Sequence, residues 1–218
     1  AHPHLSQDLN IAVVHNGIIE NMNALKEQLE SEGVVFRSET DTEILPHLIA
    51  KHYEGDPVAA VRAALGQIQG TYGIAVIFKD HPDQIIAARH GSPLVIGLGH
   101  GETVLASDPQ AIVELTRRVV YLDDREIAVI SANNVDVQRL SGGSVASNVT
   151  VLDDDSYGVA ELEGFPNFML KEIHEQPESI RRCLRGRVQV DDGNAKLGGF
   201  TMSPRDLLAI QQVTAIGC

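Results

Sequence analysis

The period of the apolar residues changes near residue 70, and this change limits the fold more than any single motif does. Between residues 20 and 70, apolar side chains recur at spacings of three and four, which is typical of amphipathic helices. Later, short apolar runs separated by Gly, Pro, Asn and Asp indicate β-strands. Helices grouped before strands predict a layered α+β domain, because alternating βαβ units would mix the two periods along the chain.

Three helices are expected in the first part of the chain. The first ends near Gly33, whose backbone freedom suits a helix terminus. The second is expected to begin with a capping box formed by Thr40 and Glu43. The third begins at Asp56, with Pro57 in its first turn, where a missing N–H costs nothing.

Short strands are expected at eight places, and one short helix should interrupt them. The expected strands are 11–15, 71–78, 84–89, 93–98, 103–107, 119–122, 126–130 and 135–140. The short helix should follow a cap at Ser107 or Asp108. Because several strands are apolar on both faces, each sheet should be covered on both faces, by helices or by a second sheet.

The character of the chain changes again near residue 153, which predicts three parts. Residues 1–152 should form the main domain, and 153–203 an acidic, turn-rich connection with a helical segment that either breaks or starts a new first turn at Pro177. Residues 204–218 should begin a further domain.

Composition excludes several classes of function. A net charge of −13 argues against a nucleic-acid surface, because phosphates repel an acidic protein. Apolar runs stay well short of the ~20 residues that a membrane helix needs. The two cysteines, Cys183 and Cys218, are too few for a disulfide framework, so we expect a reducing cytoplasm.

The stretch "VVHNGIIEN" places His15, Asn16 and Gly17 at the expected end of a strand. A side-chain amide and a neighbouring glycine N–H could form an oxyanion hole, which acyl transfer needs. Taken alone, the trio is more often a turn, since Asn-Gly is a common hairpin signal.

Asp41 lies in the expected first turn of the second helix, where the helix dipole stabilises a carboxylate. It could hold the ammonium group of a substrate. On position alone, the commoner role is to support the cap at Thr40.

The histidines do not predict a metal site. His2 and His4 could form a pair, but no cysteine or second histidine pair follows at zinc spacing. Cys183 lies in a basic segment that could lower its pKa, although a half-buried structural thiol is the commoner case. We expect no metal and no cofactor.

The order of the motifs is more specific than any one of them. "VVHNGIIEN", "SETDTE", "GTYGIAVI", "ASDPQAIVELTRRVVYLDDREIAVI", "FMLKEIHEQPESI" and the final "AIGC" together resemble the glutamine–fructose-6-phosphate aminotransferases (isomerizing), which are class II glutamine amidotransferases. This resemblance implies an N-terminal-nucleophile hydrolase fold, an αββα sandwich, here truncated. It implies a partial glutaminase domain at 1–152, an interdomain linker at 153–203 and the first strand of a sugar-isomerase domain within 204–218.

The resemblance also implies a chemistry. In that family an N-terminal cysteine attacks glutamine, and the released ammonia converts fructose 6-phosphate into glucosamine 6-phosphate. Asn16 and Gly17 match the oxyanion-hole pair, and Asp41 matches the carboxylate that binds the α-ammonium of glutamine. His2 falls in a segment near the glutamine pocket. The intact protein is expected to be a cytoplasmic homo-oligomer.

One departure limits the expectation. Residue 1 is Ala and not Cys, so we expect the nucleophile to lie outside these 218 residues and the fragment alone to be inactive. Two alternatives stay open: another class II amidotransferase, such as the purine phosphoribosyl enzyme or asparagine synthetase, and a non-catalytic glutamine-binding module.

Overall fold

The computed structural model describes residues 2–152, 164–184, 188–189, 194–195, 209–212 and 214. The chain divides into two compact units, Ala1–Ala160 and Glu161–Cys218. Residues 153–163 of the expected linker, the side chain of Cys183 and the end of the chain with Cys218 lie outside what is described. The three-part division predicted from the sequence therefore stays a prediction.

The first unit is built on an antiparallel sheet of seven strands in the order β1-β2-β3-β4-β8-β9-β10. Its strands are β1 (His4–Leu5), β2 (Ile11–Ile19), β3 (Gly70–Phe78), β4 (His81–His90), β8 (Glu126–Ile130), β9 (Val135–Arg139) and β10 (Ser144–Val145). The longest pairing joins β2 to β3 from Ile11↔Phe78 to Ile19↔Gly70. This pairing places the "HNG" trio inside a strand that is paired with β3 along its whole length.

A second antiparallel sheet of four strands packs on the first. Its order is β11-β7-β5-β6, formed by β11 (Val149–Val151), β7 (Arg118–Tyr121), β5 (Val95–Leu98) and β6 (Thr103–Ala106). Apolar side chains from both sheets, among them Ala87, Ile96 and Ala128, form a core between them. Small residues allow the two sheets to approach closely.

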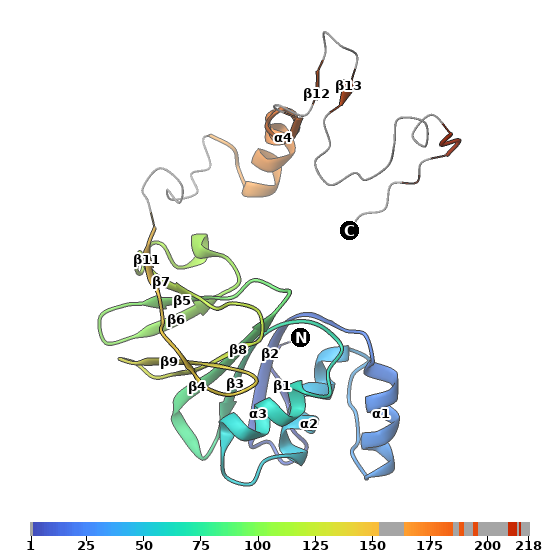
Figure 1. Cartoon of the computed structure of the whole chain (residues 1–218), viewed down its shortest axis with the longest axis vertical. Coiled ribbons are helices and arrows are strands. Elements are labelled where there is room, and N and C mark those ends of the chain that lie inside the picture. The colour runs from blue at the N-terminus through green and yellow to red at the C-terminus, as the bar shows by residue number, and fades with distance from the viewer. Residues whose placement is uncertain are drawn as a thin grey trace. The chain divides into compact units, whose positions relative to one another are not determined.

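Three helices cover the other face of the seven-stranded sheet (Figure 1). They are α1 (Met22–Ser31), α2 (Ile44–Lys51) and α3 (Pro57–Leu65). Leu45, Leu48 and Val61 from the helices are fully buried against Val13 and Ile74 of the sheet. Burial of each such side chain stabilises the fold by about 1.5–3 kcal/mol.

These layers confirm the expected α+β class and the cover on both faces of the main sheet. On the outer face of the second sheet, the described residues include the short 3-10 helix η2 (Pro109–Ala111) and the buried Leu152. A second full helical layer, which an αββα sandwich would have, is not among the described residues.

Two helix predictions are confirmed in detail. The side chain of Asp56 accepts hydrogen bonds from Val58 N and Ala59 N, which caps α3. Near Gly33, with φ of +93°, Val34 N donates to Leu29 O at 3.0 Å and closes α1. Both ends are specified by local backbone chemistry.

The predicted end of the first strand is wrong. β2 continues through His15, Asn16 and Gly17 to Ile19, so the trio is neither a turn nor a strand end. Nine consecutive pairings with β3 outweigh the local turn preference of Asn-Gly. The predicted helix after Asp108 is also shorter than expected, because η2 makes a single turn.

The predicted capping box is wrong as well. Thr40 makes no side-chain cap hydrogen bond to the 3-10 helix η1 (Asp41–Glu43) that precedes α2. The side chain of Glu43 turns instead toward residues 37 and 38, where it accepts three hydrogen bonds. A buried carboxylate gains more from three donors than from one exposed cap.

In the second unit, α4 (Phe168–Leu184) forms as predicted but does not break at Pro177. Ion pairs one turn apart flank the proline, from Lys171 to Glu175 and from Arg181 to Glu178, which support the helix on both sides. The short strands β12 (Val188–Gln189) and β13 (Asn194–Ala195) pair with each other. Among the described residues, no helix has the length and apolarity to cross a membrane.

Candidate functional site

The free edge of β2 organises the candidate site. β1 pairs with β2 at Ala12 and Val13, and no described strand covers that edge further along. The N–H of Ile19 points to this edge, where it donates to Asp41 Oδ2 at 2.7 Å. Alternate N–H groups of a strand point the same way, so the N–H of Gly17 faces the same edge. An anion placed there could accept a hydrogen bond from Gly17.

Gly17 occupies a position that excludes every other residue. Its φ is +149°, and a Cβ added there would lie 2.1 Å from the backbone oxygen of Thr71. It would also lie 2.9 Å from His15 Nε2. Glycine is therefore required for β2 and β3 to pair at this point, whatever its role in binding.

Asn16 lies on the opposite face of β2 from the helices, where it is exposed. It lines a cavity of about 240 Å³ between the two sheets, together with His2, His15, Gly73 and Ser107. His2, the weaker sequence candidate, is thus next to Asn16. The cavity presents the side-chain amide to a small ligand, with both polar and apolar residues in its other walls.

Asp41 is fixed by its bond to Ile19 and keeps one oxygen available. In the described part of the chain, no partner is present for Oδ1, which could accept a hydrogen bond from an ammonium group. Asp41 does not line the Asn16 cavity. Its hydrogen-bond donor, Ile19, lies two residues along β2 from Gly17, about 7 Å at the usual rise per residue.

His15 is a site residue that the sequence analysis did not single out. Its side chain is 6% exposed and faces the helices, with Nδ1 3.0 Å from Thr42 Oγ1 and Nε2 3.3 Å from Thr71 O. Burial lowers its pKa, although the Thr71 carbonyl and Asp41 oppose this, so the ring is neutral at pH 7. The alternation Ile11, Val13, His15 was the signal, because a buried histidine at a core position needs partners.

His15 holds β2 and the 3-10 helix η1 together. The imidazole joins β2, which carries Asn16 and Gly17, to Thr42 of η1, directly next to Asp41. Its contact with Thr71 also fixes β2 to β3 where Gly17 lies. The histidine thus links both groups of predicted site residues.

Other cavities and histidines of the described residues do not contribute to this site. A cavity of about 590 Å³ is lined by Arg62, Tyr72, His90 and Arg125 but by no predicted site residue. No group of three or more metal-ligating side chains occurs among the residues that the structure describes. His47 and His52 point to separate partners, near Glu43 and Gln67 respectively.

Comparisons with known proteins show the family to which the chain belongs. Residues 1–114 match the family described as "Glutamine amidotransferase domain". The solved structure of glutamine phosphoribosylpyrophosphate amidotransferase from B. subtilis is similar, with a TM-score of 0.55 and 27% identity over 66% of this chain and 32% of that one. The chain belongs to the glutamine amidotransferase domain family.

Curated relatives are more specific. A protein of Symbiobacterium thermophilum is 45% identical over the whole of this chain, and one of Chlorobaculum tepidum is 48% identical over 92% of it. Both are named glutamine–fructose-6-phosphate aminotransferase (isomerizing). The chain spans about a third of their length, 36% and 33% respectively.

Proposed function

We propose that this chain is the greater part of the glutamine-binding domain of a glutamine–fructose-6-phosphate aminotransferase. The observation that carries the proposal is the shared free edge of β2, where the N–H of Gly17 and the carboxylate of Asp41 face the same side. Family membership and the 45% identity over the full chain support it.

Glutamine would lie along this edge. The free oxygen of Asp41 would bind its α-ammonium group, and the side-chain amide would reach back toward Gly17 and Asn16. When a thiolate attacks the amide carbon, the carbonyl oxygen becomes negative. The backbone N–H of Gly17 and the side-chain amide of Asn16 would stabilise that charge, an interaction that commonly contributes 10²–10³ in rate, roughly 3–4 kcal/mol.

The thiol would come from outside the 218 residues, by resemblance to the family, so the chain alone should release no ammonia. Ammonia leaves as the thioester forms, and water then frees glutamate. The ammonia would aminate fructose 6-phosphate at a further domain. We propose a cytoplasmic homo-oligomer for the intact protein.

The test is an assay of the protein from its full reading frame, with amide-labelled glutamine and fructose 6-phosphate. Labelled glucosamine 6-phosphate is the expected product. Asn16→Ala should lower the rate of glutamine hydrolysis about a hundredfold or more, with little change in stability. Transfer of the label to phosphoribosylpyrophosphate, and not to fructose 6-phosphate, would overturn the assignment in favour of the purine enzyme.

A further inference from the structure

Each of the three residues of the 3-10 helix η1 contacts another segment of the fold, the first two β2 and the third the loop before η1. Asp41 accepts from the backbone of β2, and Thr42 contacts His15. Glu43 binds the loop that enters η1. A single turn of helix has little stability of its own, so these three contacts set where Asp41 lies.

Glu43 makes the strongest of the three attachments. Its Oε1 accepts from Arg37 N at 2.9 Å, and its Oε2 accepts from Ser38 N at 2.7 Å and from Ser38 Oγ at 2.6 Å. The residue is 4% exposed. Burial raises its pKa, but the hydrogen bonds from Ser38 and Arg37 outweigh burial and lower the pKa overall. The group is therefore a buried carboxylate anion, which needs all of these donors.

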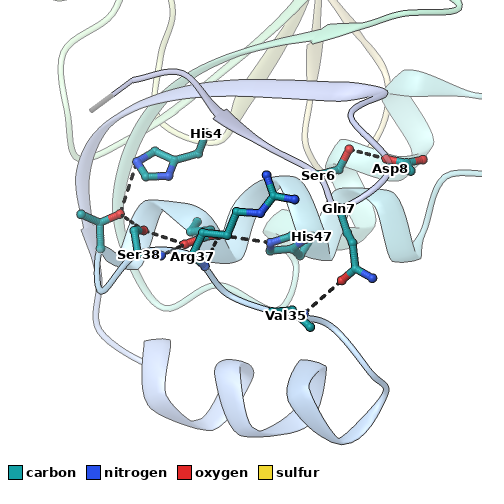
Figure 2. A network of polar contacts seen from close by, with 10 residues as sticks. His4, Ser6, Gln7, Asp8, Val35, Arg37, Ser38 and His47 are labelled. Carbon is teal, nitrogen blue, oxygen red and sulfur yellow. Dashed lines mark hydrogen bonds and ion pairs between the residues drawn. The ribbon is translucent and has the colours of Figure 1, made fainter.

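His47 lies next to the carboxylate of Glu43. Its Nε2 lies 3.6 Å from Glu43 Oε1, one turn along α2, and has no hydrogen-bond partner within normal distance. Burial lowers the pKa of His47, so it stays neutral and adds no full counter-charge. Figure 2 shows His47, Arg37 and Ser38 gathered in this one network. The backbone at 37 and 38 therefore supplies most of what stabilises the anion.

The network reaches Thr40, the residue that precedes Asp41. Ser38 Oγ lies 3.0 Å from Thr40 Oγ1, which in turn lies 3.3 Å from His4 Nε2 (Figure 2). The backbone N–H of Glu43 donates to Thr40 O at 3.3 Å. The side chain of Glu43 thus connects η1 to residues 37 and 38, which precede Asp41 in the chain.

We propose that Glu43 is a positioning residue for recognition of the amino group of glutamine. By holding residues 37 and 38, it fixes the backbone at Asp41 and the direction of the free Asp41 oxygen. Asp41 contacts Ile19, whereas Glu43 contacts Arg37. Glu43 therefore acts on the ligand through Asp41. This inference rests on the proposed function, because it needs Asp41 to bind an ammonium group.

The test compares two ligands on the 218-residue chain by calorimetric titration. One is glutamine, and the other is glutaramate, which is glutamine without its α-amino group. Glu43→Gln puts an NH2 group against N–H donors and removes the charge, so the loop should shift. The dissociation constant for glutamine should rise about tenfold, the usual effect of losing charge-assisted hydrogen bonds. The constant for glutaramate should stay within about twofold.

The matched control is Glu39→Gln, the same change in the same loop at an exposed position. It should alter neither constant. Asp41→Asn should itself remove the preference for glutamine over glutaramate. Adding Glu43→Gln to Asp41→Asn should weaken glutamine binding little further, because the effects of two residues that act through one group are not additive.

A second variant covers the case in which Glu43→Gln fails to fold. Ser38→Ala removes one of the three hydrogen bonds and should raise the dissociation constant for glutamine about threefold, while the constant for glutaramate stays unchanged. Equal losses for both ligands would overturn the positioning role in favour of a general structural one. If the unaltered chain shows no preference for glutamine over glutaramate, the proposed function fails first. If that preference exists and survives Glu43→Gln unchanged, only the inference on Glu43 fails.

Discussion

The two faces of β2 differ sharply. On the face toward the helices, Val13 is 0% exposed and His15 6%, whereas on the other face Val14 is 41% exposed and Ile18 65%. Asn16 belongs to the open face, and His15, its neighbour, belongs to the packed one. One strand therefore serves two purposes: its packed face holds the backbone still, and its open face and free edge present polar groups to a ligand.

The largest effect on stability should come from Gly17, where the packed face and the free edge of β2 meet. Gly17→Ala would place a methyl group 2.1 Å from the Thr71 carbonyl oxygen, at a φ of +149° that side chains rarely adopt. The backbone must move, because the two nearest atoms belong to the backbone carbonyl of Thr71. We expect a loss of about 3 kcal/mol or more in the free energy of unfolding, measured by denaturant titration.

Gly33→Ala is the control for that change. Gly33 also has a positive φ, +93°, but a Cβ there would meet nothing within 4 Å. Strain alone should cost about 1 kcal/mol. Equal losses at the two glycines would show that the β2–β3 contact is not as close as the structure has it.

The next effect should come from His15. His15→Phe keeps a ring of similar size but removes the contacts to Thr42 and Thr71, and it leaves the buried Thr42 hydroxyl without this partner. The loss should be about 1–3 kcal/mol at neutral pH. A variant as stable as the parent chain would show that His15 does not hold η1 to β2.

His15 also makes stability depend on pH. Burial lowers its pKa in the folded chain below the ordinary value of about 6.5, so the unfolded chain takes up the proton first as pH falls. Its contribution is complete above about pH 6.5 and is lost below it. Unfolding titrations between about pH 7.5 and 5.5 should show stability falling, with a smaller fall in His15→Phe. The fall should not vanish, because burial lowers the pKa of His47 in the same way.

The smallest effect should come from the open face. Val14→Thr changes a side chain that is 41% exposed and should alter stability by no more than about 0.5 kcal/mol. The same change at Val13, fully buried one residue earlier, buries a hydroxyl and should cost about 1–3 kcal/mol. Similar values at both positions would mean that the two faces of β2 do not differ as described.

The sequence was sufficient where local chemistry decides structure. The cap at Asp56, the end of the first helix near Gly33 and the change of period all act within a few residues, and each is confirmed. The sequence was misleading where a distant partner decides. The local sequence at Asn16-Gly17 predicts a turn, but pairing with β3 extends the strand through both residues. The local sequence at Glu43 predicts a helix cap, but the buried side chain binds residues 37 and 38 instead.

The candidate site divides in the same way. The motif order indicated Asn16, Gly17 and Asp41, and their roles remain predictions. His15 was not selected, because its importance depends on contacts with residues 27 and 56 positions away in the chain. The alternation Ile11, Val13, His15 indicates the face that His15 occupies, but nothing local indicates its partners Thr42 and Thr71.

The most direct test of the central claim is a titration of the isotope-labelled 218-residue chain with glutamine, followed by the backbone amide resonances. The N–H groups of Gly17 and Ile19 lie on the edge where glutamine should bind, so both should shift in a saturable manner. Asp41→Asn should abolish the shifts. Glutamine binding that leaves Gly17 and Ile19 unchanged, or that is as tight in Asp41→Asn as in the parent chain, would contradict the account.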